Sequence, residues 1–538
     1  MNPTKTNSPQ NPLGANSKVG RWAESTLQRQ LFLTLLALYL FTLGGYLYSG
    51  DGLASYGTAW SLVEGQGGAL EDYFTAPQFG FPGREGHFFS KYGLGQAVID
   101  LPFVLVAKGL GLLIPGFKAD QTGRLLTSLL NGLVVAFSAL VLYRLVRQLG
   151  YGVRTRVGVA LLYGVGTMAW AYARFDFSEP LLALFYLLMG RALFAWGCHP
   201  EKERGLLKVG LWLGFAVTVK PAAGLALLSV LLYIIYRVVK PNQADLQKRV
   251  VWLTLVRLFL WLGLPLFGAT LLVLGYNYYR FNSISETGYG AIKDQFVAGS
   301  FYGGIFGFLL SPGKSLFLYS PGLIFAMFGL RLFFKEKEQK AETLFILALC
   351  VTYLLFYSFF WNWEGDWTWG PRYLLPVFPF LILFSAPLFE KFGVGRRQGF
   401  YLSICAALAV NALGVFTHFD RYLLANYHAG VNQDWRFVPE LSPLRGQFYL
   451  LASAVSQALG QPALTMDYLA WDPVRVAAIR AIIPLKDYSE FDLWWLRPAN
   501  SGNWLVALIM GLLFAGLLWQ AWRHFYRSYR MVKEFEGY

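Results

Sequence analysis

The chain has 538 residues, of which 55% are hydrophobic, 17% aromatic and only 14% charged. A soluble domain carries about a quarter charged residues, so this composition excludes an ordinary soluble protein and indicates a polytopic membrane protein. The net charge of +15 does not indicate a nucleic-acid-binding protein, because Lys and Arg cluster in short gaps between apolar runs. That distribution is the positive-inside pattern of cytoplasmic loops.

Apolar runs separated by basic gaps predict an all-α bundle of about twelve transmembrane helices. The runs lie near 31–48, 122–143, 157–173, 179–197, 206–219, 221–237, 251–276, 317–334, 343–360, 373–389, 399–417 and 503–522. Both termini are then expected in the cytoplasm, with a disordered tail over 1–29. Residues 503–538 supply the last span and a basic cytoplasmic tail.

The outer face is predicted to carry a surface helix and a separate segment. Residues 94–115 are apolar enough to span, but a crossing there would put the basic cluster at 144–156 outside. The charge rule therefore favours a helix that lies on the outer surface or dips into it. Beyond a transmembrane module over 30–417, the stretch 418–502 has no span and is expected to form an extracytoplasmic lid or small domain.

The first candidate for chemistry is Asp51, which follows the first predicted span within Ser-Gly-Asp-Gly. The residues after it predict an amphipathic helix along the outer surface. Asp51 at such a helix start is either a capping residue or a catalytic carboxylate at the lipid–water boundary.

Two further outer motifs carry charges. Ser90-Lys91-Tyr92-Gly93 opens the surface helix, where Lys91 is either a phosphate contact or a side chain that reaches lipid headgroups. Asp176 and Glu179 lie at the outer end of two spans, where Pro180 fits an ordinary helix start. A catalytic partnership with Asp51 is the sharper interpretation of this acidic pair.

Two later loops combine aromatic and charged residues. The stretch 277–290 contains Arg280 and Glu286. The stretch 361–373 contains four tryptophans among glycines and acids, followed by Arg372 and Tyr373. Aromatics at a span end usually anchor the helix at the interface, but four in one short loop exceed that need. Rings such as Trp363 and Trp367 suit stacking on sugars, and Arg372 suits a phosphate.

Two patterns resemble known sites without meeting their requirements. Residues 311–315 (Ser-Pro-Gly-Lys-Ser) imitate the end of a P-loop, but Phe308 stands where the upstream glycine is required. The five histidines have no metal-ligand spacing. Glu364 and Asp366 offer oxygen ligands to a divalent cation, although two acidic residues alone do not indicate a metal site.

In chain order, these residues resemble the GT-C superfamily of glycosyltransferases, in the branch of the protein O-mannosyltransferases and the lipid A aminoarabinose transferase (glycosyltransferase family 39-like). The resemblance covers roughly 30–390. Its marks are Asp51, Ser90-Lys91-Tyr92, Glu179-Pro180, Thr-Val-Lys-Pro at 218–221, Arg280 and Gly-Pro-Arg-Tyr-Leu-Leu-Pro at 370–376. The chain departs from the family at two places. It has Asp51-Gly52 where the protein mannosyltransferases have an aspartate–glutamate pair, and it has Gly-Leu-Gly after Lys91 where prolines are common in the family.

The resemblance implies inverting transfer of a sugar from a polyprenyl-phosphate donor to a hydroxyl of a glycan, lipid or protein on the extracytoplasmic face of a cell (inner) membrane. Membrane lipids would be partners, and no metal or other cofactor is required. Asp51 would be the base, with Glu179 or Asp176 sharing that role or positioning the acceptor. Cationic stabilisation of the phosphate and contacts to substrate are expected from Lys91, Tyr92, Arg280, Glu286, Trp363, Trp367, Arg372 and Tyr373.

A transporter or flippase for a lipid-linked or sugar substrate is the alternative. Such proteins often show inverted repeats and helices broken at the midplane. The sequence shows no fixed-period repeat, and its polar motifs gather on one face, which favours an enzyme. A ligase or polymerase that takes a lipid-diphosphate donor remains open beside the first interpretation.

Overall fold

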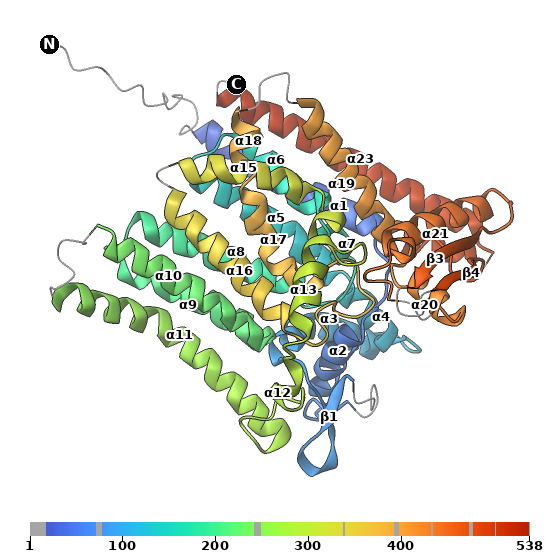
Figure 1. Ribbon diagram of the computed structural model, residues 1–538, viewed down its shortest axis with the longest axis horizontal. Helices are drawn as coiled ribbons and strands as arrows, with labels where there is room; N and C mark the ends of the chain where they lie inside the picture. Colours follow the sequence, from blue (N-terminus) through green and yellow to red (C-terminus); the bar gives the residue numbers. More distant parts are fainter. Residues whose placement is uncertain are drawn as a thin grey trace.

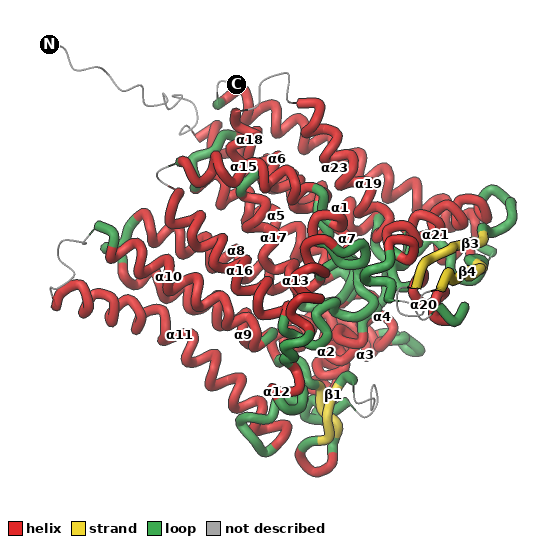
Figure 2. The backbone as a smooth tube through the Cα atoms, viewed as in Figure 1, coloured by secondary structure: helices red, strands yellow, loops and turns green. Residues whose placement is uncertain are grey.

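The computed structural model describes residues 18–70, 78–241, 249–336, 339–391, 397–431, 434–472, 477–500 and 502–536. Within them, long helices lie roughly side by side, and the described strands form two short hairpins (Figures 1 and 2). The prediction of an all-α polytopic membrane protein is confirmed, because the apolar runs of the sequence are the helices of the bundle.

The helices of the N-terminal half are α1 (Lys18–Phe41), α2 (Gly50–Val63), α3 (Leu94–Leu113), α4 (Ala119–Thr127), α5 (Leu130–Gln148), α6 (Val153–Gly166), α7 (Ala169–Tyr172), α8 (Glu179–Cys198), α9 (Leu206–Val219), α10 (Ala226–Val239) and α11 (Arg249–Phe281). The later helices are α12 (Ile292–Gln295), α13 (Ser300–Leu310), α14 (Leu316–Tyr319), α15 (Gly322–Lys335), α16 (Lys340–Ser358), α17 (Phe378–Leu383), α18 (Ala386–Lys391), α19 (Arg397–Phe416), α20 (Arg421–His428), α21 (Pro443–Ala458), α22 (Arg497–Asn500) and α23 (Trp504–Phe535). The antiparallel hairpins are β1 (Gly80–Pro82) with β2 (Phe88–Ser90), and β3 (Thr465–Asp472) with β4 (Ala477–Pro484).

Among the described residues, eight helical segments are long and apolar enough to cross a bilayer. They are Leu94–Leu113, Ala119–Gln148, Glu179–Cys198, Pro221–Val239, Arg249–Phe281, Lys340–Ser358, Arg372–Lys391 and Trp504–Phe535. The runs predicted at 157–173, 206–219 and 317–334 are helices α6, α9 and α15, which are shorter than a full crossing. The segment 94–113, predicted to lie at the surface, qualifies as a span by length and composition.

The N-terminal boundaries differ from the sequence prediction. Residues 1–17 lie outside the described part of the chain, but 18–29, predicted as disordered tail, form the first turns of α1. They are ordered because Glu24 is buried and pairs with Arg147 and Arg156, each at 3.2 Å. The helix ends at Phe41, before the predicted span end at residue 48, and the chain then turns through Gly45, whose φ is +75°.

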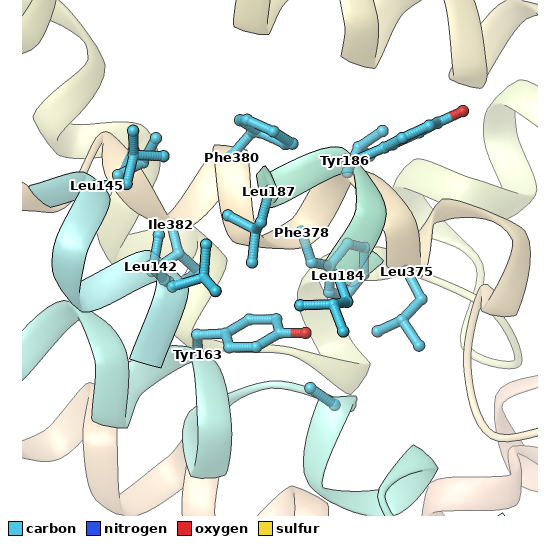
Figure 3. Packing of buried hydrophobic residues seen from close by; sticks show 14 of the residues in the cluster. Leu142, Leu145, Tyr163, Leu184, Tyr186, Leu187, Leu375, Phe378, Phe380 and Ile382 are labelled. Carbon is cyan, nitrogen blue, oxygen red and sulfur yellow. The ribbon is translucent and has the colours of Figure 1, made fainter. Parts of the chain in front are cut away.

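The core lies between the central helices. Figure 3 shows side chains of α5, α6 and α8 packed against those of the segment 372–383. Leu142 of α5, Tyr163 of α6, Leu187 of α8 and Phe378 of α17 are almost wholly buried there. A bundle with so large an apolar core fixes the ends of its helices, which is where the polar motifs of the sequence lie.

The described residues of the segment 418–502 include α20, α21 and the β3–β4 hairpin, which lie at one end of the molecule (Figure 1). It has a small core of its own, which includes Tyr422, Leu450 and Ile483. A salt bridge of 2.6 Å between buried Arg174 and Asp492 holds it to the bundle.

Candidate active site

Asp51 lies in the first turn of α2, the helix that the sequence predicted after it. The Ser49 Oγ caps this helix by accepting a hydrogen bond from the Gly52 backbone N–H at 2.9 Å. A carboxylate in the first turn is favoured by the positive end of the helix. The Asp51 side chain keeps a quarter of its surface exposed, so it is held in place but reachable.

Two side chains from distant parts of the sequence hold the Asp51 carboxylate. The Tyr92 hydroxyl donates to Oδ1 at 2.6 Å, and the Arg372 Nη1 lies 3.2 Å from Oδ2. Burial alone would raise the pKa of Asp51, but Arg372 and the Tyr92 hydrogen bond outweigh it and hold that pKa below the ordinary value. Asp51 is therefore ionised at neutral pH.

Asp176 lies beneath the start of α2 and does not bind Asp51 directly. Its Oδ1 accepts backbone hydrogen bonds from Tyr48 at 2.9 Å and Ser49 at 3.0 Å. A Cβ at Gly52 would lie 1.7 Å from the Asp176 Oδ2, so this glycine permits the close approach. Burial raises the pKa of Asp176 to about 6, despite the two backbone N–H groups. Its contacts assign Asp176 to positioning α2.

Glu179 is buried at the start of α8 and pairs with Lys220, at 3.0 Å. The Lys220 Nζ also lies 4.7 Å from the centroid of the Tyr373 ring. Sequence reasoning used Lys220 only as part of the Thr-Val-Lys-Pro motif and gave it no role. The structure places this cation in the same charge cluster as Asp51, whose pKa it helps to lower.

Lys91 differs from the other cations near Asp51 in the partners of its charge. Its Nζ lies 5.4 Å from the Tyr92 ring centroid and 5.2 Å from that of Tyr289, and it forms no salt bridge within the part of the chain that the structure describes. Burial lowers the pKa of Lys91, while Asp51 opposes that shift. Within the described residues, no carboxylate forms a salt bridge that would neutralise the Lys91 charge.

A cavity of about 620 Å³ extends from Lys91 between α3, α9 and α11. Along α11 its lining runs from Pro265 to Arg280, which is about 22 Å at the helical rise per residue. Most of the wall is apolar, with Leu, Val, Phe and Trp side chains from these helices. Figure 1 shows α11 inclined away from the rest of the bundle. Its lining makes the cavity an apolar groove with a cationic end at Lys91 and Arg280.

Arg280 lines that cationic end but is already engaged. Its Nη1 donates to the backbone oxygens of Ser90 and Tyr92, and its Nη2 donates to Asn277 at 2.7 Å. It thus fixes the segment that carries Lys91. Glu286 accepts a hydrogen bond from the Gly288 backbone N–H at 2.8 Å and shapes the loop that covers Lys91.

The aromatic residues predicted in the 361–373 loop separate into two groups. Trp363 is 4% exposed and packs against Phe308 of α13, with ring centroids 5.5 Å apart, so it anchors the loop to that helix. Trp367 is 37% exposed and faces outward. Tyr373 is buried, stacks on Tyr357 at 4.6 Å and accepts a hydrogen bond from the Arg372 Nη2.

The same loop is held by a residue that sequence reasoning set aside. Lys314, from the stretch that imitates a P-loop, is fully buried. Its Nζ donates to the backbone oxygens of Asp366, Thr368 and Gly370 at 2.8 to 3.2 Å. A lysine among glycine and serine carries no sequence signal for such a role, because its acceptors lie about fifty residues away.

Within the described residues, no group of three or more His, Cys, Asp and Glu side chains is arranged to hold a metal ion. The carboxylate of Asp366 faces Arg372 at 3.4 Å, and that of Glu364 pairs with Arg436 at 2.6 Å. Both acids that the sequence offered to a cation are thus paired with arginines.

Residues 118–278 match the family model of the dolichyl-phosphate-mannose-protein mannosyltransferases. This match confirms the resemblance to GT-C glycosyltransferases that the sequence motifs predicted, and with the apolar helices it supports a multi-pass membrane glycosyltransferase. The comparison with curated proteins found no match.

Three solved structures are similar in fold. ArnT from Cupriavidus metallidurans in the apo state is 13% identical, with a TM-score of 0.42 over 97% of this chain and 78% of that one. ArnT of that organism bound to undecaprenyl phosphate is 14% identical, with a TM-score of 0.41 over 82% and 73%. The apo oligosaccharyltransferase of Archaeoglobus fulgidus is 13% identical, with a TM-score of 0.40 over 73% and 54%.

Proposed function

We propose that the chain transfers a sugar from a polyprenyl-phosphate donor to an acceptor hydroxyl, with Asp51 as the base. The observation that carries the proposal is the position of Asp51 beside one end of the apolar groove. Its carboxylate binds Tyr92, and the preceding residue, Lys91, lines that end of the groove and helps to lower the pKa of Asp51. An apolar groove with a charged end fits a lipid phosphate, because the prenyl chain and the phosphate need opposite surroundings. The family matched by 118–278 is itself named for a polyprenyl-phosphate sugar donor.

The chemistry requires no general acid. In the transfer, the acceptor oxygen bonds to the anomeric carbon as the bond from that carbon to the phosphate oxygen breaks, and the electron pair leaves with the phosphate. The leaving group is a phosphate monoester with a last pKa of about 6, so it departs near neutral pH as an anion. The hydroxyl proton passes to Asp51. Attack opposite the leaving group inverts the anomeric centre.

The cations near Asp51 have different roles in this proposal. Lys91, whose charge is unpaired among the described residues, is assigned the phosphate. Arg280 holds the backbone around Lys91, and Arg372 holds Asp51 ionised. On this proposal the fixed charge of Lys91 stabilises the developing anion, and no metal ion is needed.

The proposed orientation follows from the charge pattern. The basic gaps of the sequence are assigned to the cytoplasm together with both termini, which places Asp51 on the extracytoplasmic face of the membrane. A donor anchored in the outer leaflet would then reach the groove sideways from the bilayer.

Asp51→Asn tests the base. The variant is expected to lose sugar transfer while it still binds undecaprenyl phosphate, because the groove and Lys91 are unchanged. Transfer would be measured by mass spectrometry of the acceptor, and binding by titration of the purified protein in nanodiscs. Wild-type transfer by the variant would refute the assignment, and lipid movement without sugar transfer would favour the transporter alternative.

Lys91→Ala tests the donor site. Loss of one charge-assisted contact to a phosphate costs about 1.5–3 kcal/mol, so undecaprenyl phosphate should bind about 10 to 100 times more weakly. Lys118→Ala is the matched control, since Lys118 is an exposed lysine between α3 and α4. Equal affinity of the two variants would place the phosphate elsewhere.

A further inference from the structure

A second cavity, of about 700 Å³, lies between the 361–372 loop and the segment 418–502. We call it the outer cavity, and its lining differs from that of the lipid groove. The residues around it are Glu364, Asp366, Trp367, Val431, Asp434, Trp435 and Arg436. Three carboxylates, two indoles and a guanidinium face a space large enough for a small ligand.

The outer cavity is connected to the base by one side chain. The guanidinium of Arg372 binds Asp51 through Nη1 at 3.2 Å and Asp366 through Nη2 at 3.4 Å. Asp366 therefore belongs to the lining of the outer cavity and to the charge cluster around Asp51. A ligand held against Asp366 contacts a carboxylate that shares the Arg372 guanidinium with the proposed base.

The walls of the outer cavity are fixed by bonds between distant segments. The Gly313 backbone N–H donates to the Arg436 carbonyl at 3.1 Å, and the Ser442 hydroxyl donates to the Pro312 carbonyl at 2.7 Å. The Lys314 Nζ donates a hydrogen bond to the Asp366 carbonyl. Asp366 itself has a φ of +61°, a conformation that costs energy for a residue other than glycine and marks functional loops.

The lining is suited to a polyhydroxylated ligand. Exposed Trp367 offers an apolar face on which the C–H side of a pyranose ring can stack, while carboxylate oxygens accept hydrogen bonds from several hydroxyls. A lipid tail would leave these charges unsolvated, which is costly. None of the lining residues lies in a described strand, so the cavity offers a peptide no sheet edge for pairing.

We propose that the outer cavity binds the acceptor, and that the acceptor is a saccharide. The inference rests on the proposed glycosyl transfer and names its second substrate. A sugar ring stacked on Trp367 with hydroxyls on Asp366 and Glu364 presents a further hydroxyl toward Asp51. That hydroxyl gives its proton to Asp51 as its oxygen bonds to the anomeric carbon of the donor.

The test compares strains of the organism that encodes the chain, carrying the wild type, Asp51→Asn, Trp367→Ala or Trp361→Ala. Trp361 is the matched control, because it is an exposed tryptophan of the same loop that bonds Gln295 and does not line the outer cavity. Mass spectrometry of envelope glycans, lipids and proteins identifies the molecule that loses a sugar in the Asp51→Asn strain. We expect a glycan, with a partial loss of the same sugar in the Trp367→Ala strain and no loss in the Trp361→Ala strain.

Purified proteins in nanodiscs separate binding from folding. Loss of an aromatic contact worth about 1.5 kcal/mol raises the KM of Trp367→Ala for that glycan about tenfold, and Trp367→Phe recovers most of the difference. The affinity of Trp367→Ala for undecaprenyl phosphate, used as the probe of the lipid groove, should stay within twofold of the wild type.

The outcomes are distinct for the two proposals. If Asp51→Asn changes no envelope molecule, the proposed transfer itself is wrong. If it strips a sugar from a protein or a lipid that has no glycan, the saccharide acceptor is wrong while the transfer stands. If the target is a glycan but Trp367→Ala transfers with the wild-type KM, the acceptor does not bind in the outer cavity.

Discussion

Asp176→Asn is expected to change how the stability of the protein depends on pH. The Asp176 Oδ1 accepts two backbone hydrogen bonds, and its Oδ2 is buried with no hydrogen-bond partner among the described residues. Burial raises the pKa of this carboxyl from 3.8 to about 6. Ionisation of Asp176 therefore lowers the free energy of unfolding, although the same carboxylate positions the start of α2.

The magnitude follows from the two pKa values. Because the pKa is raised on folding, the native state binds more protons than the unfolded state between about pH 4 and 6, and the free energy of unfolding falls as the pH rises. A shift of about 2 units corresponds to about 3 kcal/mol above pH 6, of which about 2 kcal/mol develops between pH 4.5 and 7.5. Asparagine keeps an oxygen for the backbone groups and has no charge to bury.

The assay compares the free energy of unfolding of wild type and variant in detergent micelles at pH 4.5 and 7.5, by denaturant titration. The unpartnered amide of the variant costs the same at both pH values, so the variant-minus-wild-type difference should rise by about 2 kcal/mol at the higher pH. Asp294→Asn, on the exposed turn α12, should show no such change. An equal difference at both pH values for Asp176→Asn would refute the argument from burial.

Three further changes test the surroundings of Asp51. Tyr92→Phe removes the hydroxyl that donates to Asp51, so transfer should slow about tenfold, by the 1.5 kcal/mol or more of a hydrogen bond to a charged group, with unchanged donor affinity. Arg372→Gln leaves burial unopposed, so the pKa of Asp51 rises and the acid limb of the pH–rate profile should move to higher pH; an unmoved limb would contradict this. Lys314→Met removes the donor of three backbone carbonyl groups, two of them in buried contacts, so the free energy of unfolding should fall by about 3 kcal/mol, and an unchanged unfolding midpoint would contradict the contacts assigned to Lys314.

The sequence was sufficient to predict the class of protein, because a membrane helix can be recognised from its own residues and those that flank it. An apolar run with basic flanks needs no knowledge of its neighbours, and most of the predicted runs are helices here. The helix that follows Asp51 and the helix start at Glu179 were likewise read from nearby residues. Boundaries that depend on packing were misplaced, as in α1, whose first turns are ordered by the ion pairs of buried Glu24 with Arg147 and Arg156.

The candidate site was predicted only in part, since partners there come from far along the chain. The sequence singled out Asp51, Tyr92 and Arg372 as separate motifs, whereas their mutual contacts join residues up to 321 positions apart. Lys220 was noted only as part of a motif, and Lys314 was set aside as a poor P-loop.

The sequence by itself thus determined that this chain crosses a membrane and carries acids, cations and indoles near the ends of its apolar runs. Those properties follow from transfer free energies that act residue by residue. Only the tertiary structure decided which charge serves which task. Arg372 and Arg280 bind oxygen atoms of the protein, whereas Lys91 contacts aromatic rings and forms no salt bridge among the described residues. Trp363 is buried while Trp367 faces the outer cavity. The reason is physical, because the role of a charge depends on what its neighbours have already neutralised, and helix packing sets those neighbours.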